Sequence, residues 1–328
     1  MSEVSTGFIV GMVFLAVFVS YVITSVMLFH YPTLIHRKKK QVFRCRHISH
    51  RGGAGENLEN TMTAFKHALS VGTQMLEIDC QLTLDGQVVV SHDNSLLRST
   101  GLDQLISETN FKDIPPLKPC LKLDFCPNHV TKGSEDKQIP LLRDVFAAFP
   151  DTPINIDVKV DSDLLMQKIS DLIKEFKREE ITVWGNFSNV ITNKLHRLNP
   201  QVPLLFSMRR VTITILLYYT GLLPFVPLKE SFFEVMMPSA IGKAAENLSP
   251  RYKRILGLAN FLMMSKPLFN HFKRRGIQVY LWVLNEDEDF ERAFRRYDVD
   301  GVMTDFPTRL KGFLDNHPEY RQSEELLN

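Results

Sequence analysis

From Arg46 onward, the sequence alternates short apolar segments with amphipathic stretches. This alternation limits the fold more than any other feature, because strands separated by helices pair in parallel and build an α/β sheet. The expected strands are Arg46–His50, Met75–Leu82, Val88–His92, Pro153–Val160, Ile181–Trp184, Pro203–Ser207, Glu234–Pro238, Val279–Leu284 and Gly301–Thr304. Seven to nine strands in roughly 280 residues favour a TIM-like (β/α)8 barrel over an open sheet.

Several of the intervening stretches have the periodicity of amphipathic helices. They include Thr61–Val71, Leu164–Phe176 and Phe290–Arg296. The first is followed by Gly72, a residue that commonly ends helices. These stretches supply the crossovers that a parallel barrel needs.

Two segments depart from the alternation. Only Thr83–Gln87 joins the second and third expected strands. A parallel crossover needs a dozen or more residues, so we expect an antiparallel hairpin there. Residues 101–138 are irregular and contain four prolines, which predicts an inserted loop or small subdomain. Long loops of this kind in compact domains are often functional.

The segment Gly7–Phe29 is strongly apolar and contains no charged residue. As a helix it is long enough to cross a hydrocarbon core of about 30 Å. A cleaved signal peptide is the alternative, but its apolar part would be only about 7–15 residues long and would follow a basic segment. Here the basic cluster follows the run instead. We therefore expect a transmembrane anchor in residues 1–30 and a basic linker in 31–45, with the bulk of the protein on the cytosolic side.

A second apolar run, Val211–Leu228, contains no charged residue but is interrupted by Gly221, Pro224 and Pro227. A true span here would separate the last strands from the first, and one barrel could not close. We expect a segment that dips into the membrane or acts as a lid, with a buried core helix and a membrane span as the alternatives. Residues 46–312 then form the barrel domain, and 313–328 form a polar tail.

The overall composition excludes some classes of function. A net charge of +2 lacks the basic excess of a general nucleic-acid binder. The four cysteines form no CxxC pair and lack zinc-ligand spacing, so a thiolate metal site is not expected. We expect free thiols or core residues, with a Cys120–Cys126 disulfide as the alternative in an oxidising compartment.

Carboxylates recur at same-face spacing on two expected strands. Glu77 and Asp79 point to one face of theirs. Buried together they would repel each other unless a cation lay between them, and a hard divalent ion such as Ca²⁺ or Mg²⁺ suits these ligands. Asp157 and Lys159 repeat the spacing, as a candidate third ligand and a candidate contact for a phosphoryl oxygen. The alternatives are a solvated acidic pair on an edge strand and an exposed ion pair at a strand end.

His50 and His92 each end an expected strand. Barrel enzymes build their active sites at the carboxyl ends of the strands. Two histidines supply a base and an acid near neutral pH, as a phosphodiester transfer requires. The alternative for each is an ordinary structural histidine.

Several ordered motifs resemble those of the glycerophosphodiester phosphodiesterase family. HRGGAGENLENT, at residues 50–61, resembles its HRG and PENT signature with Leu58 in place of proline. The other matching segments are 76–79 (E-x-D), 83–86 (T-x-D-G), 89–93 (V-x-H-D), 155–159 (E-x-K), 282–285 (W-T-x-N) and 301–307 (G-x-x-T-D-x-P). The resemblance covers about residues 46–312. The apolar N-terminal run and the segment LLPFVPL resemble the membrane-anchored mammalian lysophospholipase D branch of this family.

The resemblance implies a TIM-like barrel, one divalent cation (Ca²⁺ or Mg²⁺) and roles for individual residues. The implied roles are acid–base catalysis for His50 and His92, metal binding for Glu77, Asp79 and Asp157, phosphate binding for Arg51 and Lys159, and support of the site for Glu59, Asn60 and Trp282. Asp157 stands where the family has glutamate. The shorter side chain alters the metal preference or admits a bridging water.

The implied activity is a metal-dependent lysophospholipase D. It would hydrolyse lysophosphatidylcholine, lysophosphatidylethanolamine and alkyl-lyso forms to lysophosphatidic acid and a free amino alcohol, through a cyclic phosphate. The expected partners are the lysophospholipid and the membrane, at the endoplasmic reticulum and perinuclear membranes, with no nucleic acid and no obligate protein partner. The alternatives are a phosphodiesterase for water-soluble diesters and a catalytically silent lipid-binding protein.

Overall fold

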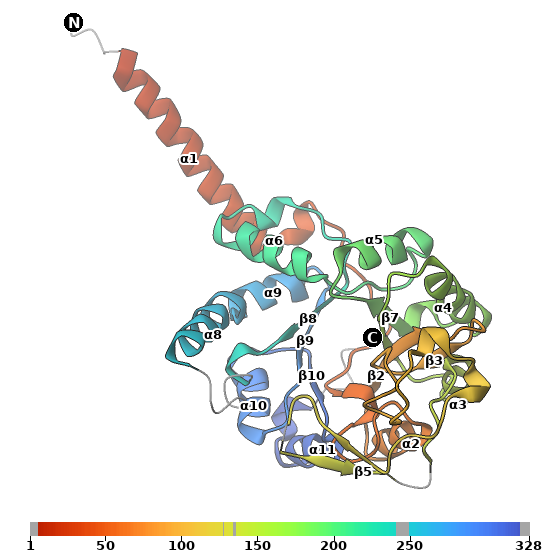
Figure 1. The fold of residues 1–328 in the computed structure, drawn as a ribbon. Helices are drawn as coiled ribbons and strands as arrows, with labels where there is room; N and C mark the ends of the chain where they lie inside the picture. Colours follow the sequence, from red (N-terminus) through yellow and green to blue (C-terminus); the bar gives the residue numbers. More distant parts are fainter. Residues whose placement is uncertain (1–5, 127, 134–135, 241–248, 322–328) are drawn as a thin grey trace, which may run out of the picture.

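A ring of parallel strands forms the centre of the fold (Figure 1). The strands are β1 (His47–Ser49), β2 (Met75–Leu82), β6 (Ile154–Val158), β7 (Thr182–Gly185), β8 (Phe232–Met236), β9 (Gln278–Trp282) and β10 (Gly301–Thr304). They pair in the order β7-β6-β2-β1-β10-β9-β8. Leu204 bridges to Trp184 and Leu205 to Phe232, so this short segment takes the eighth position and closes the ring. The predicted TIM-like barrel is confirmed.

The computed structural model describes residues 6–126, 128–133, 136–240 and 249–321. Parts of the predicted anchor (1–5), insertion (127 and 134–135) and tail (322–328) lie outside these residues. The strand predicted at Pro203–Ser207 forms only the two bridges that close the ring. The strand predicted at Glu234–Pro238 lies two residues earlier, at β8.

Helices lie on the outside of the ring, where all except the last connect successive strands. They are α2 (Met62–Ser70), α3 (Leu142–Ala148), α4 (Asp163–Glu175), α5 (Asn189–Leu198), α6 (Met208–Tyr219), α8 (Pro250–Met263), α9 (Lys266–Arg274), α10 (Asp287–Glu291) and α11 (Pro307–Asn316). The predicted helix Thr61–Val71 is α2, and Thr61 caps it by accepting a hydrogen bond from the amide of Ala64 at 3.2 Å. The predicted helix Phe290–Arg296 begins earlier, at α10, and continues as a π-helical turn over Arg292–Arg296.

The predicted hairpin is confirmed. β3 (Val88–Val90) pairs antiparallel with the end of β2, with Cys80 opposite Val90. The insertion contains a second hairpin, β4 (Cys120–Lys122) with β5 (Val130–Lys132). The Thr131 hydroxyl donates to the carbonyl of Ala54 at 2.6 Å. The insertion is therefore tied to the loop that follows β1.

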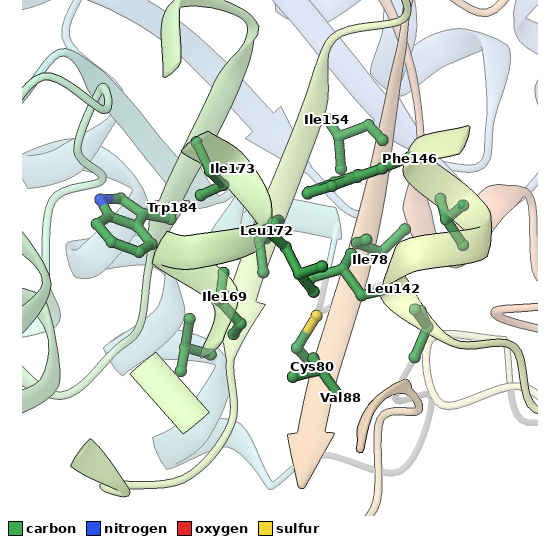
Figure 2. Close-up of a cluster of buried hydrophobic side chains, with 14 of the residues drawn as sticks. Ile78, Cys80, Val88, Leu142, Phe146, Ile154, Ile169, Leu172, Ile173 and Trp184 are labelled. Carbon is green, nitrogen blue, oxygen red and sulfur yellow. The ribbon is translucent and has the colours of Figure 1, made fainter. Parts of the chain in front are cut away.

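The outer face of the ring packs against the helices, as Figure 2 shows for β2, β6, α3 and α4. Ile78 and Cys80 of β2 are buried there with Phe146 of α3. Because side chains alternate along a strand, Glu77 and Asp79 on the same strand point to the inside of the ring. Burial of Ile78 and Cys80 in the core outside the ring therefore directs the alternate residues of β2 into the pocket inside the ring.

All four cysteines are free thiols. Cys45 and Cys80 are buried, Cys120 is exposed and Cys126 is partly exposed. The alternative of a Cys120–Cys126 disulfide is wrong in this structure, whereas the expectation of free thiols or core residues is confirmed.

α1 (Thr6–His30) is the one helix in the described residues that is long and apolar enough to cross a membrane. Its first part projects away from the barrel (Figure 1). Its last part docks on the turn after α6, where the Tyr21 hydroxyl donates to the carbonyl of Thr220 at 2.5 Å and the Ser25 hydroxyl to that of Gly221 at 2.6 Å. Phe29 stacks on His271 of α9, with 4.6 Å between ring centroids. The helix is thus joined to the barrel by side-chain contacts as well as by the linker.

The alternative of a second membrane span at Val211–Leu228 is wrong. α6 ends at Tyr219 after 12 residues, and a separate 3-10 turn, η6 (Leu223–Phe225), follows. A span needs about 20 residues. The alternative of a buried core helix is also a poor description, because Val211 and Thr214 are the only residues of α6 that are fully buried.

Candidate active site

One pocket of about 270 Å³ opens inside the ring. Its polar wall consists of His50, Arg51, Glu77, Asp79, His92, Asn155, Asp157, Lys159, Asn186 and Glu234. Its apolar wall consists of Phe125, Phe187, Leu205, Phe206, Met236, Trp282 and Met303. The pocket therefore brings together all the residues predicted for the site except Glu59 and Asn60, which lie behind it and hold residues that line it.

The carboxylate of Asp305 holds the ring of His50, and the pairing of β1 with β10 places the two residues side by side. Ser49 of β1 pairs with Thr304 of β10, so Asp305 follows next to His50. Asp305 Oδ1 lies 2.7 Å from Nδ1 of His50, and both groups are buried. Burial opposes ionisation of Asp305, but the charge and hydrogen bond of His50 lower its pKa below the usual value. With Nδ1 engaged, Nε2 is the nitrogen left for proton transfer.

His92 is held in a similar way by its neighbour. Nδ1 of His92 lies 2.7 Å from Asp93 Oδ1. Arg98 donates to the other oxygen of Asp93 and, at 2.5 Å, to Glu59. Burial opposes ionisation of Asp93, but His92 and Arg98 lower its pKa. Glu59 thus supports His92 through a chain of ion pairs.

The turn after β1 presents Arg51 in an uncommon backbone conformation. Arg51 has a φ of 49° and Gly52 a φ of 77°. A Cβ on Gly52 would lie 2.5 Å from the Phe65 ring, so glycine is required by both conformation and space. This conformation directs the amide of Arg51 to Glu77 Oε2 at 2.8 Å. The HRG motif therefore positions both a cation and the acidic strand.

The Arg51 guanidinium is buried among three carboxylates. It donates to Glu59 at 3.2 Å and to Asp124 at 2.9 Å, and its Nε lies 3.5 Å from Asp79. Burial disfavours the cation, but these carboxylates raise its pKa further. Asp124 belongs to the insertion, so that segment contributes to the site. The sequence indicated only that a long loop such as residues 101–138 is often functional, and it did not single out Asp124.

The acidic pair on β2 is asymmetric. Asp79 accepts from Asn60 at 2.9 Å and from Lys159 at 2.8 Å. Burial opposes its ionisation, but Lys159 and Arg51 hold its pKa below the usual value. Burial and the Asp79 charge raise the pKa of Glu77 well above its usual value, and the described residues give Glu77 no ion pair. Glu77 is therefore a buried acid whose charge the Arg51 amide and the nearby charges of Lys159 and Arg51 offset only in part.

Lys159 lies between the two acidic strands. Its ammonium is 2.8 Å from Asp79 and 2.7 Å from Asp157. Burial disfavours the charge, but the two carboxylates raise its pKa. Asn186 donates to the second oxygen of Asp157 at 2.8 Å. Asp157 is thus already satisfied by a cation and an amide.

Glu234 of β8 is a site residue that the sequence did not reveal. Asn155 of β6 donates to its Oε2 at 2.7 Å, while Oε1 is buried and has no hydrogen-bond partner among the described residues. Burial raises the pKa of Glu234 to about 8. Along the sequence, Glu234 occupies an ordinary inward-facing position of a strand. Only its contact with Asn155 across the pocket identifies it as a site residue.

The donor set suits a hard divalent cation. Among the described residues, no three His, Cys, Asp or Glu side chains already converge closely enough to hold a metal ion. Carboxylate oxygens are nevertheless the ligands that Ca²⁺ and Mg²⁺ prefer. Glu77, whose pKa burial and the Asp79 charge raise, faces the same pocket as Asp79 and Asp157. A cation beside Glu77 would stabilise its ionised form.

Known proteins resemble this chain over most of its length. The model of the glycerophosphoryl diester phosphodiesterase family matches residues 50–309. The chain is 52% identical over 298 residues to rat (Rattus norvegicus) lysophospholipase D GDPD1, covering 90% of this chain and 94% of that protein. It is 39% identical over 300 residues to human lysophospholipase D GDPD3, covering 91% and 94%.

Solved structures share the fold at low sequence identity. A glycerophosphoryl diester phosphodiesterase domain from Mycobacterium tuberculosis superposes with a TM-score of 0.63 and 14% identity, covering 83% of this chain and 99% of that domain. A phosphodiesterase from Oleispira antarctica, solved with the product sn-glycerol-3-phosphate, gives 0.57 and 18%, covering 84% and 100%. The barrel, the pocket and these matches agree: the chain belongs to the glycerophosphoryl diester phosphodiesterase family of phosphodiester hydrolases.

Proposed function

We propose that this chain is a divalent-metal-dependent lysophospholipase D. The observation that carries the proposal is the pair of histidines in one pocket, each with Nδ1 on a carboxylate and Nε2 left for proton transfer. Arg51 and Lys159 supply positive charge beside them. The lysophospholipase D name of relatives at 52% and 39% identity supports a lysolipid as substrate.

In the proposed reaction the substrate supplies its own nucleophile. A lysophospholipid has a free glycerol hydroxyl beside its phosphodiester. One histidine takes the proton of this hydroxyl, whose oxygen attacks phosphorus and forms a cyclic phosphate. The other histidine protonates the oxygen of the leaving amino alcohol. A diacyl lipid lacks this hydroxyl and would not react.

Water completes the reaction with the roles exchanged. The histidine that gave its proton now takes one from water, and water oxygen opens the cyclic phosphate. The other histidine returns its proton to the glycerol oxygen as the ring P–O bond breaks. The product is lysophosphatidic acid. Arg51 and Lys159 stabilise the negative charge that develops on the phosphoryl oxygens. The buried carboxylate of Asp305 and the partly exposed carboxylate of Asp93 keep the two rings oriented through both steps.

Glu77, Asp79 and Asp157 are the residues that would hold the cation. When bound, a divalent ion would polarise the phosphoryl oxygen and lower the pKa of the glycerol hydroxyl. Because a lysine and an asparagine already satisfy both Asp79 and Asp157, we expect Glu77 to contribute most of the affinity. Glu59, Asn60 and Trp282 support this arrangement from behind or beside the pocket.

We further propose that α1 anchors the protein in a membrane, at the endoplasmic reticulum and perinuclear region. The domain boundaries follow: an anchor in residues 1–30, a basic linker in 31–45 and the barrel in 46–312. The segment 211–228 contacts the membrane beside α1, since Leu216 and Tyr219 are 61% and 49% exposed while the adjacent turn holds Tyr21 and Ser25.

Purified full-length protein tests the reaction directly. With Ca²⁺ or Mg²⁺ it should release choline from lysophosphatidylcholine, and chelation of the metal should stop the release. His50→Ala and His92→Ala should each abolish turnover while the thermal unfolding midpoint stays within a few degrees of wild type. Faster release from glycerophosphocholine than from the lysolipid would assign the enzyme to water-soluble diesters. Lipid binding without any release would make it a silent binding protein.

A further inference from the structure

The surface helix α8 has one face that attaches it to the barrel. Leu256, Ala259 and Met263 recur at helical spacing and are partly buried. Met263 packs against the hydrophobic core formed by β8, β9 and their helices. None of the residues of α8 is fully buried. The helix is thus attached to the barrel along one narrow stripe, and its outer side does not contact the barrel core.

The outer side of α8 is apolar. Ile255, Leu258 and Phe261 are 53%, 60% and 72% exposed. Residues three apart on a helix are neighbours, so these side chains form one continuous ridge. A surface helix of a soluble protein normally carries polar residues on this side. A contiguous exposed ridge of large apolar side chains marks a site of interaction.

The charges of α8 are all positive and gather at one end. Arg251, Lys253 and Arg254 are exposed in its first turns, and the helix contains no acidic residue. Cations at a helix N-terminus oppose the helix dipole, so helix stability does not explain them. An anionic surface outside the protein does explain them, because it attracts clustered basic residues next to an apolar face.

The apolar end of α8 lies beside the docking site of α1 (Figure 1). The Tyr219 hydroxyl at the end of α6 donates to the carbonyl of Leu262 at 3.2 Å. The next residue, Thr220, accepts from Tyr21 of α1. About 20 helical residues cross the hydrocarbon core, and counted from Thr6 they reach Ser25, which bonds to the same turn. A bilayer around α1 therefore has its boundary at the level of this turn and of the end of α8.

We infer that α8 docks on the bilayer that holds α1. Leu258 and Phe261 enter the interfacial region near α1, and Ile255 extends the contact along the helix. Arg251 and Lys253 lie among anionic headgroups at the other end. This docking requires that α1 is inserted, as proposed above, but it does not depend on the reaction that the pocket catalyses.

Lipid-quenched fluorescence of single labels tests the docking. Full-length protein with Cys120→Ser and Cys126→Ser receives an environment-sensitive fluorophore at Leu258→Cys, at Leu84→Cys or at Val13→Cys. Leu84 is 62% exposed, matching the 60% of Leu258, and lies in the β2–β3 turn, away from α1. Each protein is reconstituted into phosphatidylcholine vesicles containing phosphatidylserine. Vesicles with spin-labelled phosphatidylcholine provide the quencher.

We expect a blue-shifted emission at position 258 and severalfold stronger quenching by the spin-labelled lipid than at position 84. Quenching at 13 with water-like emission at 258 would overturn the docking and leave the anchor intact. A blue shift at 258 without lipid quenching would also overturn it, because a second protein copy or another protein would then cover the ridge. No quenching at 13 would refute the anchor and the docking together.

A charge variant tests the anionic component. In Arg251→Gln/Lys253→Gln, the quenching at 258 should no longer increase when phosphatidylserine is added. The matched control is Arg295→Gln/Arg296→Gln, which removes exposed cations of the π-helical turn and should keep the increase. An equal response of both variants to phosphatidylserine would overturn the role of these basic residues. Equal thermal midpoints verify that both variants fold.

Discussion

Nδ1 of His50 lies 2.7 Å from the buried carboxylate of Asp305, a residue 255 positions later in the chain. In the proposed reaction, this contact would fix the ring orientation and stabilise the imidazolium that forms during proton transfer. Replacing Asp305 with Asn keeps the shape of the side chain but removes its charge. We expect Asp305→Asn to lower kcat by about 10²- to 10⁴-fold with little change in KM, by analogy with other His–Asp pairs.

Steady-state kinetics over a range of pH measure this effect. A positioning role also predicts a displaced pH–rate profile, which a merely structural role would not produce. Asp315→Asn, an exposed aspartate on α11, is the matched control and should leave the profile unchanged. An Asp305→Asn enzyme with wild-type kcat would show that the contact does not serve catalysis.

Metal binding should depend most on Glu77, the buried acid whose charge its neighbours offset only in part. We expect Ca²⁺ or Mg²⁺ to raise the thermal midpoint of the wild-type protein, because a ligand that binds the folded state stabilises it. The increase should be much smaller in Glu77→Gln at the same ion concentration. Differential scanning fluorimetry measures it without any substrate. Glu175→Gln, an exposed acid on α4, serves as control. An identical increase in Glu77→Gln would exclude Glu77 as a ligand.

His47 makes folding sensitive to acid. Burial, aided by the Lys311 charge, lowers its pKa to about 4, compared with about 6.5 in an unfolded chain. Between these values the unfolded chain binds more protons, so the free energy of unfolding falls as pH decreases from about 6.5 to about 4. His47→Gln should flatten this part of the curve by at most about 3 kcal/mol. Urea unfolding at several pH values checks it, with His67→Gln, a partly exposed histidine, as control.

Phe146 tests the core behind the site. Its ring is fully buried between α3 and the strands (Figure 2). Phe146→Ala should lower the free energy of unfolding by about 3–5 kcal/mol, because it removes a large apolar side chain and leaves a cavity. Exposed Leu84→Ala should cost far less. Denaturant unfolding monitored by circular dichroism gives both values, and a loss of under about 1 kcal/mol for Phe146→Ala would contradict close packing at this position.

The order of the barrel strands was predictable because their apolar runs are continuous and separated by helical periodicity. The antiparallel pairing of β2 with β3 was also predictable, because the five-residue link between them is too short for a parallel crossover. The segment at Leu204 was overestimated as a full strand, because an apolar run does not reveal how many residues pair. α6 shows a related limit: hydropathy predicted a long apolar segment, but not that its helix ends at Tyr219.

The candidate site was predictable where its residues follow strands, as His50 and His92 do, or alternate along one strand, as Glu77 and Asp79 do on β2. Asp305 and Asp93 also follow strands, yet their contacts with the histidines arise from the pairing of β1 with β10 and from a local turn. Asp124 and Glu234 reach the site through tertiary contacts alone. A pattern along the chain carries no information about such contacts, so only the structure reveals them.

The pairing of β1 with β10 also has a consequence for how the protein is made. β1 emerges from the ribosome soon after α1, but its neighbour in the ring is the last strand of the sheet to be synthesised. One edge of β1 therefore stays unpaired until almost the whole barrel domain has been synthesised. Asp305 follows β10, so the His50–Asp305 contact is completed only after translation has passed both. We expect the barrel to acquire the His50–Asp305 pair at the end of its biogenesis, long after the N-terminal helix α1 has been synthesised.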